Sequence, residues 1–210
     1  MKSLIKFKKS KPLVPNKRID GFFSETDSLA LYFTILSQSP KSILEIGHFL
    51  GKSTAAICSA INVMSHKVEF DSYDLPFTSE ADFIEFYSPV HQRSVSPSKK
   101  FQKVYKKRTT STELARINLH KVGLENFVNL QAKDYTKEQV KGYDFIFSDA
   151  VHDIPEITLH LPHITDRSNA GATWVFHDQN EENISFVTQN SNSTLIFRIG
   201  SLAIYRFNQS

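Results

Sequence analysis

Two histidines and two aspartates follow apolar segments of the kind that form buried strands. Asp149 and His152 follow the segment YDFIFS, and His177 and Asp178 follow the segment ATWVF. In an open α/β sheet, the carboxyl ends of adjacent parallel strands meet at one edge, where such sheets bind their ligands. We therefore expect the four side chains to converge on one cleft, where an imidazole with a pKa near neutrality can accept a proton.

A second chemical signal is a turn that carries two glycines. The stretch ILEIGHFLGKST runs from Ile43 to Thr54 and has glycines at positions 47 and 51, between an apolar segment and a helix-like one. Glycines let a ligand approach the backbone closely, and the free N–H groups at the start of a helix attract polar or anionic groups. The turn therefore predicts a binding site for a nucleotide-like ligand.

Two well-known glycine motifs match this turn only in part. The dinucleotide fingerprint G-x-G-x-x-G needs glycine where Phe49 and Lys52 stand. The phosphate loop G-x-x-x-x-G-K-[ST] shares its tail with residues 51–53, but Gly47 leaves the loop one residue short. A phosphate-loop nucleotide hydrolase or kinase, with Asp149 as its magnesium-holding acid, is therefore the alternative that stays open.

A third pattern, E-x-G-x-x-x-G-x-[ST], is met in full by Glu45, Gly47, Gly51 and Ser53. With this loop the chain resembles class I S-adenosylmethionine (SAM)-dependent methyltransferases, in particular the family 24-like branch that includes catechol-type, small-molecule and sugar O-methyltransferases. The resemblance extends over residues 22–207. It implies methyl transfer from SAM to a hydroxyl of a small molecule or a sugar.

The resemblance also implies which residues hold SAM. These are Glu45, Gly47, Gly51, Ser53, Asp74, Asp134 and Asp149. In this family an acid at the end of the second strand accepts the ribose hydroxyls, and Asp74 matches it, with Asp71 as a nearby competitor. An acid after the third strand approaches the adenine amine, and Asp134 matches that one.

Methyl transfer to a hydroxyl needs a base or a metal ion to deal with the acceptor's proton. His152 is the first choice for the base and His177 the second, with Asp149 beside them as the third catalytic candidate. Catechol-type relatives hold a divalent cation, and the matching residues here are Asp149, Asp178 and Gln179. Gln179 replaces an asparagine but offers the same amide oxygen, so Mg²⁺ stays an alternative to the histidine base.

The elements that must position these residues predict an α/β fold. We expect a Rossmann-like open, mostly parallel sheet flanked by helices, with a C-terminal antiparallel hairpin at Gly200-Ser201. Strands are expected at residues 42–46, 67–73, 127–131, 143–148, 172–176, 194–199 and 202–207. Helices are expected from a cap at Asp27 or Ser28 to Pro40, and at residues 53–63, 79–87, 111–121 and 136–141, with a helix or an irregular turn at about 154–165.

Charge and composition divide the chain further. Residues 1–18 and 93–108 each hold seven Lys or Arg and no acid. We expect residues 1–20 to form a basic N-terminal arm and residues 21–210 one methyltransferase domain, with a lid of little buried surface at about 77–109. The basic segments are interpreted as solvated surfaces. Alternatively, the basic segments attract an anionic substrate. If they bind RNA, the chain could instead be a non-catalytic protein that binds an adenosyl ligand or RNA.

The remaining composition excludes several classes of protein. A chain of 210 residues with 40% hydrophobic residues can bury one sizeable core. The single cysteine, Cys58, excludes a disulfide framework and a cysteine-built zinc site. No apolar run approaches the roughly 20 residues of a membrane span, and no signal-peptide pattern opens the chain. We expect a cytoplasmic protein with a small-molecule acceptor, and leave a homo-oligomer open.

Overall fold

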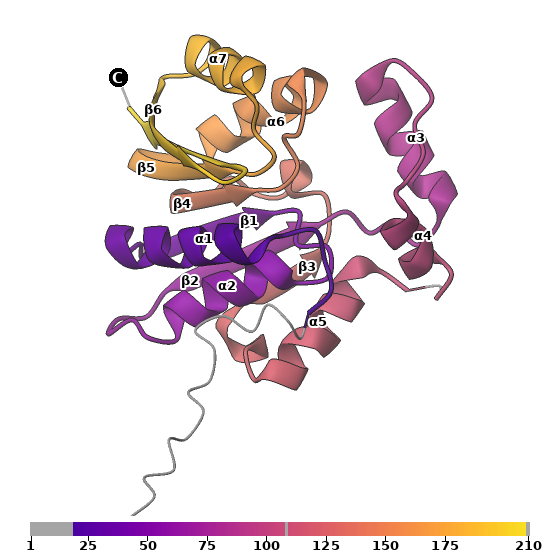
Figure 1. Ribbon diagram of the computed structural model, residues 1–210, viewed down its shortest axis with the longest axis horizontal. Helices are drawn as coiled ribbons and strands as arrows, with labels where there is room; N and C mark the ends of the chain where they lie inside the picture. Colours follow the sequence, from indigo (N-terminus) through magenta and orange to yellow (C-terminus); the bar gives the residue numbers. More distant parts are fainter. Residues whose placement is uncertain (1–18, 108, 209–210) are drawn as a thin grey trace, which may run out of the picture.

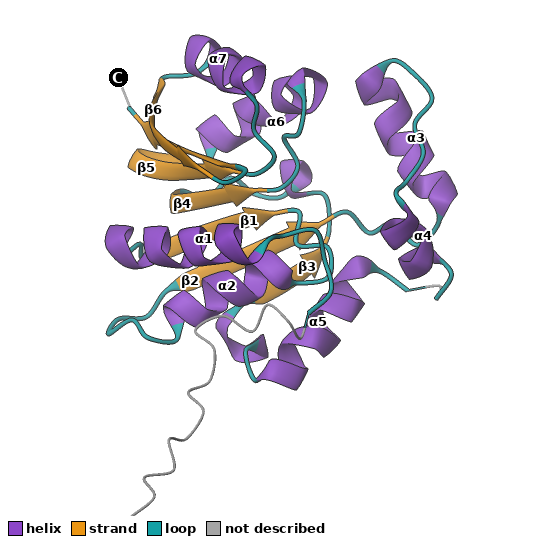
Figure 2. Ribbon diagram, in the orientation of Figure 1, coloured by secondary structure: helices purple, strands orange, loops and turns teal. Residues whose placement is uncertain are grey.

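The computed structural model describes residues 19–107 and 109–208. The predicted basic arm therefore lies outside the described residues, except for its last two. One seven-stranded sheet runs through the protein in the order β3-β2-β1-β4-β5-β7-β6 (Figure 2). The strands are β1 (Ser42–Ile46), β2 (Glu69–Asp74), β3 (Asn129–Ala132), β4 (Tyr143–Ser148), β5 (Ser168–Phe176), β6 (Ser193–Ile199) and β7 (Leu202–Phe207).

The sheet is parallel from β3 to β5 and antiparallel at its other edge. Ile46, the last residue of β1, is level with Tyr73 of β2 and with Ser148 of β4. The carboxyl ends of these strands therefore lie side by side. Strand β7 pairs antiparallel with both β5 and β6. The predicted Rossmann-like sheet with a terminal antiparallel hairpin is confirmed.

Helices cover both faces of the sheet (Figure 1). One face carries α1 (Glu25–Gln38), α2 (Lys52–Ile61) and α5 (Ser111–Val122), and the other carries α6 (Ile154–Asp166) and α7 (Glu181–Asn190). Each layer has its own hydrophobic core. Side chains alternate along β4, so that Phe145 and Phe147 join the first core and Ile146 the second.

Two further helices lie beyond the carboxyl ends of the parallel strands. They are α3 (Glu80–His91) and α4 (Lys99–Tyr105), and Figure 1 shows them apart from both layers. A capping box between Ser79 and Asp82 begins α3, and Gln92 ends it in the left-handed conformation. We call residues 77–107 the lid. Where the sequence predicted one short helix, the lid has two.

Other differences from the predicted elements have local causes. Helix α1 begins earlier than predicted, because the Ser24 hydroxyl accepts the Asp27 N–H and caps it. The helix expected near residues 136–141 is only a short 3₁₀ turn at Tyr135–Lys137. Helix α7 was missed because its sequence is mostly polar. Among the described residues, no helix has the length and apolar character needed to cross a bilayer.

Candidate functional site

The glycine turn connects β1 to α2 and contains three residues with positive φ. The angle is 86° at Gly47, 45° at Phe49 and 86° at Gly51, in a region that favours glycine. The Gly47 N–H donates to the Tyr73 carbonyl at 2.8 Å. A Cβ on Gly47 would lie 2.8 Å from the backbone carbonyl oxygen of Asp149. Asp149, which follows β4, therefore leaves no room for a side chain at this position.

Glu45 holds the turn from inside the protein. Its carboxylate is fully buried and accepts hydrogen bonds from the hydroxyls of Ser53 at 2.6 Å, Thr54 at 2.7 Å and Ser72 at 2.6 Å. Burial raises the pKa of Glu45 to about 7, although the three hydroxyl donors act in the opposite direction. Glu45 and Ser53 do not line the cavity described below. They fix the loop that a ligand would contact.

We expect Glu45→Ala to lower the free energy of unfolding by about 3 kcal/mol or more, because three buried hydroxyls lose their acceptor at about 1–3 kcal/mol each. Urea denaturation followed by circular dichroism measures the change. Glu85→Ala, at an exposed position of α3, is the control and should leave the unfolding midpoint close to that of the unmodified protein. A similar small effect for both variants would show that the Glu45 network does not stabilise the fold.

Asp74 ends β2 and lines a cavity at the carboxyl edge of the sheet. Its carboxylate accepts the N–H groups of Phe49 and Leu75, both at 2.9 Å, and the Ser111 hydroxyl at 2.7 Å. Burial raises the pKa of Asp74 to about 6 against these hydrogen bonds. Asp71, the predicted competitor, instead accepts hydrogen bonds from Lys141 and Tyr143. Of the two acids, only Asp74 faces the cavity.

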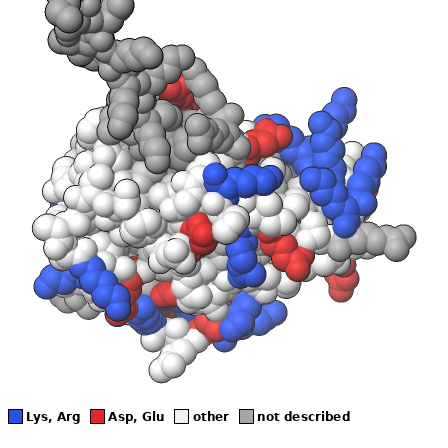
Figure 3. All heavy atoms as spheres, turned by 90° about the horizontal axis from the view of Figure 1, so that it is seen from below, with Lys and Arg blue, Asp and Glu red and all other residues white. Residues whose placement is uncertain are grey.

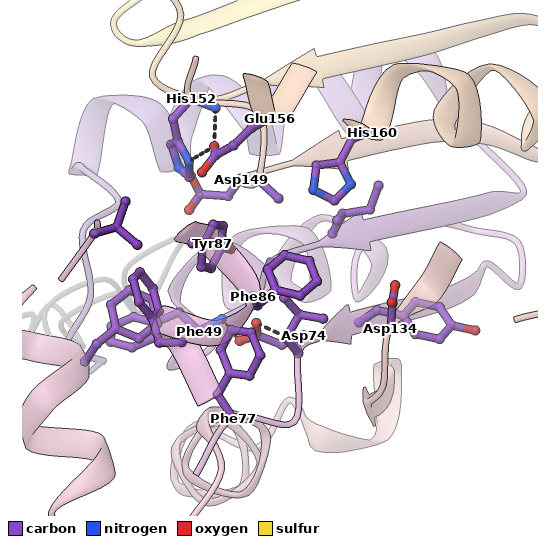
Figure 4. A pocket seen from close by; sticks show the side chains of 18 of the residues that line it. Phe49, Asp74, Phe77, Phe86, Tyr87, Asp134, Asp149, His152, Glu156 and His160 are labelled. Carbon is purple, nitrogen blue, oxygen red and sulfur yellow. Dashed lines mark hydrogen bonds and ion pairs between the residues drawn. The ribbon is translucent and has the colours of Figure 1, made fainter. Parts of the chain in front are cut away.

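Asp134 follows β3 and lines the same cavity (Figure 4). One carboxylate oxygen accepts the N–H of Thr136 at 3.1 Å and its hydroxyl at 2.7 Å, and the other lies 3.3 Å from the Lys137 ammonium. The structure thus places Gly47, Asp74, Asp134 and Asp149, four of the predicted SAM-binding residues, around one space. Gly51 starts α2 and does not line it.

Asp149 lies at the end of β4, in contact with both predicted histidines. Its Oδ1 is 2.7 Å from Nδ1 of His177 and 3.2 Å from Nε2 of His152. Burial alone would raise the pKa of Asp149, but the hydrogen bonds from His152 and His177 outweigh it and hold the pKa well below its usual range. His177 is 3% exposed and lies behind Asp149 rather than in the cavity lining.

His152 lies between two carboxylates. Its Nδ1 is 2.8 Å from Oε2 of Glu156, and the same oxygen accepts its backbone N–H at 2.9 Å (Figure 4). Burial acts to lower the pKa of His152, but the contacts with Asp149 and Glu156 raise it well above the usual value. The two carboxylates therefore favour the protonated form of the ring. Sequence reasoning did not identify Glu156, and the only signal for it was an acid four residues after the histidine.

The structure assembles only part of the predicted metal site. Asp149 and Asp178 both line the cavity, and together with His152 they offer ligand atoms within 4.8 Å of one another. Gln179 is 2% exposed, and its amide nitrogen donates to the carbonyls of Val151 at 2.7 Å and His177 at 2.8 Å. Gln179 does not line the cavity, so the oxygen-only set predicted for Mg²⁺ does not come together.

The cavity has a volume of about 400 Å³, and aromatic side chains of the lid form much of its wall. They are Phe77, Phe83, Phe86, Tyr87 and Phe101. Phe101 also lies 4.3 Å, between ring centroids, from Phe49 of the glycine turn. These rings are half-buried and α3 has no buried residue, but sequence reasoning did not identify them as part of the cavity wall. The spacing of three of them at residues 83, 86 and 87 was the available signal, because it places them on one face of a helix.

The family model of a methyltransferase domain matches residues 44–179, and the chain belongs to this family. The resemblance inferred from the glycine turn is thereby confirmed. No curated protein sequence matches the chain.

Solved structures with the same fold share little sequence with this chain. The O-methyltransferase from Bacillus cereus, in complex with SAH, has a TM-score of 0.58 at 15% identity, and the match covers 88% of this chain and 82% of that one. TomG from Streptomyces achromogenes, an O-methyltransferase in complex with SAM, has a TM-score of 0.55 at 15% identity, and the match covers 89% of this chain and 81% of that one. A methyltransferase from Geobacter sulfurreducens has a TM-score of 0.60 at 15% identity, and the match covers 90% of this chain and 82% of that one.

Proposed function

We propose that the protein transfers the methyl group of SAM to a hydroxyl of a small molecule. The observation that carries this proposal is the side-chain-free Gly47 at the cavity wall, with Asp74 and Asp134 at the next two strand ends. Backbone groups can approach the amino acid part of SAM at the turn, and the carboxylates can accept its ribose and adenine donors. The phosphate-loop alternative needs Lys52 to reach phosphates, but Lys52 does not line the cavity.

Methyl transfer mainly requires that the acceptor oxygen, the methyl carbon and the sulfur of SAM lie in line. The acceptor oxygen attacks the methyl carbon, the carbon–sulfur bond breaks with its electron pair staying on sulfur, and the hydroxyl proton passes to a base. Holding donor and acceptor in line accounts for much of the rate enhancement. His152 lines the cavity and is the base we propose, after it has lost the proton that it shares with its carboxylate neighbours.

We expect methyl transfer to continue in the presence of a chelator such as EDTA. The reason is that Gln179 does not line the cavity, because its amide nitrogen is held by two backbone carbonyls, so it does not complete the predicted metal site. Initial rates with and without EDTA give the answer. Loss of activity in EDTA, restored by a divalent cation, would contradict the proposal and would implicate a cation held by Asp149 and Asp178, which would lower the pKa of the acceptor hydroxyl.

The lid favours an acceptor with a flat, apolar body over a sugar. Aromatic rings stack on planar ligands and exclude water, whereas sugars need many polar partners. Transfer of a labelled methyl group from SAM to matched sets of phenols and sugar alcohols compares the two classes. Faster transfer to the phenols supports the proposal, and faster transfer to the sugars would overturn this part of it.

The second basic segment stays a candidate for contact with an anionic substrate. Figure 3 shows Lys and Arg gathered at the end of the molecule where Figure 1 places α4. Lys100 of α4 is engaged within the protein, because its ammonium donates to the Gly21 carbonyl at 2.7 Å and lies 4.3 Å from the centre of the Phe22 ring. The cytoplasmic location, the homo-oligomer and the domain boundaries stay predictions.

A further inference from the structure

The last residue of α3 makes a polar contact between the lid and helix α6 of the body. His91 inserts its imidazole between two carboxylates of the first turn of α6, with Nδ1 3.2 Å from Oδ2 of Asp153 and Nε2 3.4 Å from Oε1 of Glu156. The side chains of His91 and Glu156 are 10% and 9% exposed. Polar groups buried to this degree are kept in place by their partners. The contact therefore fixes where the lid meets α6.

Glu156 uses its two oxygens for two different histidines. Oε1 contacts His91 of the lid, while Oε2 accepts both the backbone N–H and the Nδ1 hydrogen of His152. Glu156 is the third residue after the N-cap Asp153, where a glutamate ordinarily caps the helix by accepting the N-cap N–H. Here the carboxylate reaches one residue further back, to His152. Helix capping alone does not account for this contact.

The contact with Glu156 also determines which ring nitrogen of His152 points toward the cavity. With Nδ1 held by a carboxylate, Nε2 is the nitrogen that points toward Asp149 and the cavity. A base needs a third group of this kind to keep its ring oriented. Here that third group is Glu156, and its other partner is His91 of the lid. The same carboxylate therefore contacts both the ring of His152 and the lid.

We propose that Glu156 is a positioning residue that orients His152, and that His91 couples this orientation to closure of the lid over the cavity. The inference rests on the proposed function. A lid that moves away withdraws His91 and leaves Glu156 with one partner fewer. The ring of His152 is then free to turn, so the base is aligned when the lid covers the bound molecules.

The test uses the full chain labelled with ¹⁵N-histidine, and S-adenosylhomocysteine (SAH), the demethylated product, as the probe. Nuclear magnetic resonance observes the Nδ1 hydrogen of His152, assigned by its loss in His152→Asn, and hydrogen exchange observes the amides of α3. We expect His91→Gln to broaden the His152 signal and to speed exchange in α3 about tenfold. Glu156→Gln should shift the signal, because a neutral amide replaces the charged acceptor.

Glu85→Gln, on the exposed side of α3, is the matched control and should change neither observable. If His91→Gln leaves the His152 signal as in the unmodified protein, the coupling is wrong, and if Glu156→Gln leaves it unchanged, the positioning role is wrong. His91→Gln carries the test alone if Glu156→Gln does not fold. Calorimetry of SAH binding tests the proposed function separately from the coupling. An unmodified protein that fails to bind SAH would contradict the proposed function itself.

Discussion

His152→Ala is expected to lower the rate of methyl transfer by about 10²–10⁴-fold, the range found when a general base is removed. The affinity for SAM should change far less than the rate, since the ring of His152 bonds to Asp149 and Glu156 and not to the glycine turn, Asp74 or Asp134. Rates of SAH release with a phenolic acceptor, together with calorimetric SAM titration, separate the two effects.

The matched control for this variant is His163→Ala. His163 is on α6, close along the chain to His152, but does not line the cavity, so this variant should retain nearly full activity. Equal rates for both variants would leave His152 a structural residue.

The rate of the unmodified protein should also depend on pH in a defined direction. A base must be deprotonated to act, and the pKa of His152 lies well above the usual histidine value because Asp149 and Glu156 stabilise the charged ring. The rate should therefore be low near pH 6.5 and rise as the pH increases through the raised pKa. A rate that is already at its plateau at pH 6.5 would show that His152 is not the base.

Gly47→Ala is expected to weaken SAM binding by about 10- to 100-fold, because an added methyl group forced into a packed site costs about 1–3 kcal/mol. Its Cβ would lie 2.8 Å from the Asp149 carbonyl oxygen, and φ is +86°. Either the turn or the end of β4 must move, and both contribute to the cavity wall. Calorimetry with SAM measures the change.

The control for this variant is Gly123→Ala. Gly123 has φ of +74°, but its added methyl group would meet nothing within 4 Å. It therefore carries the backbone strain, about 1–2 kcal/mol, without the clash. Equal SAM affinities in the two variants would show that Gly47 is not part of the donor site.

The fold was predictable because its signals are local. The segment YDFIFS is apolar on both faces, as a central parallel strand requires, and it forms β4. Gly200-Ser201 predicted the hairpin turn that joins β6 and β7. Helix α7 and the short helix α4 were missed for the opposite reason, since a polar or short helix depends on its packing and has only a weak pattern of its own.

The candidate site was predictable where topology alone brings residues together. Asp149, His152 and Asp178 end neighbouring strands, so the sheet places them at one edge. The position of Gln179 and the partners of His152 depend on side-chain packing instead. Glu156 reaches back along its own helix, and the lid aromatics enter from a segment outside the sheet, so no spacing in the sequence specified which atoms they contact.

Calorimetric titration of the unmodified protein with SAM and, separately, with ATP distinguishes a site for the methyl donor from a site for a nucleoside triphosphate. The glycine turn, Asp74 and Asp134 are proposed to bind the amino acid, ribose and adenine parts of SAM, and the lining of the cavity lacks Lys52, which a triphosphate would need. We expect saturable binding of SAM with one site per chain, and no detectable heat of binding with ATP at the same concentrations. Binding of ATP in preference to SAM would contradict it.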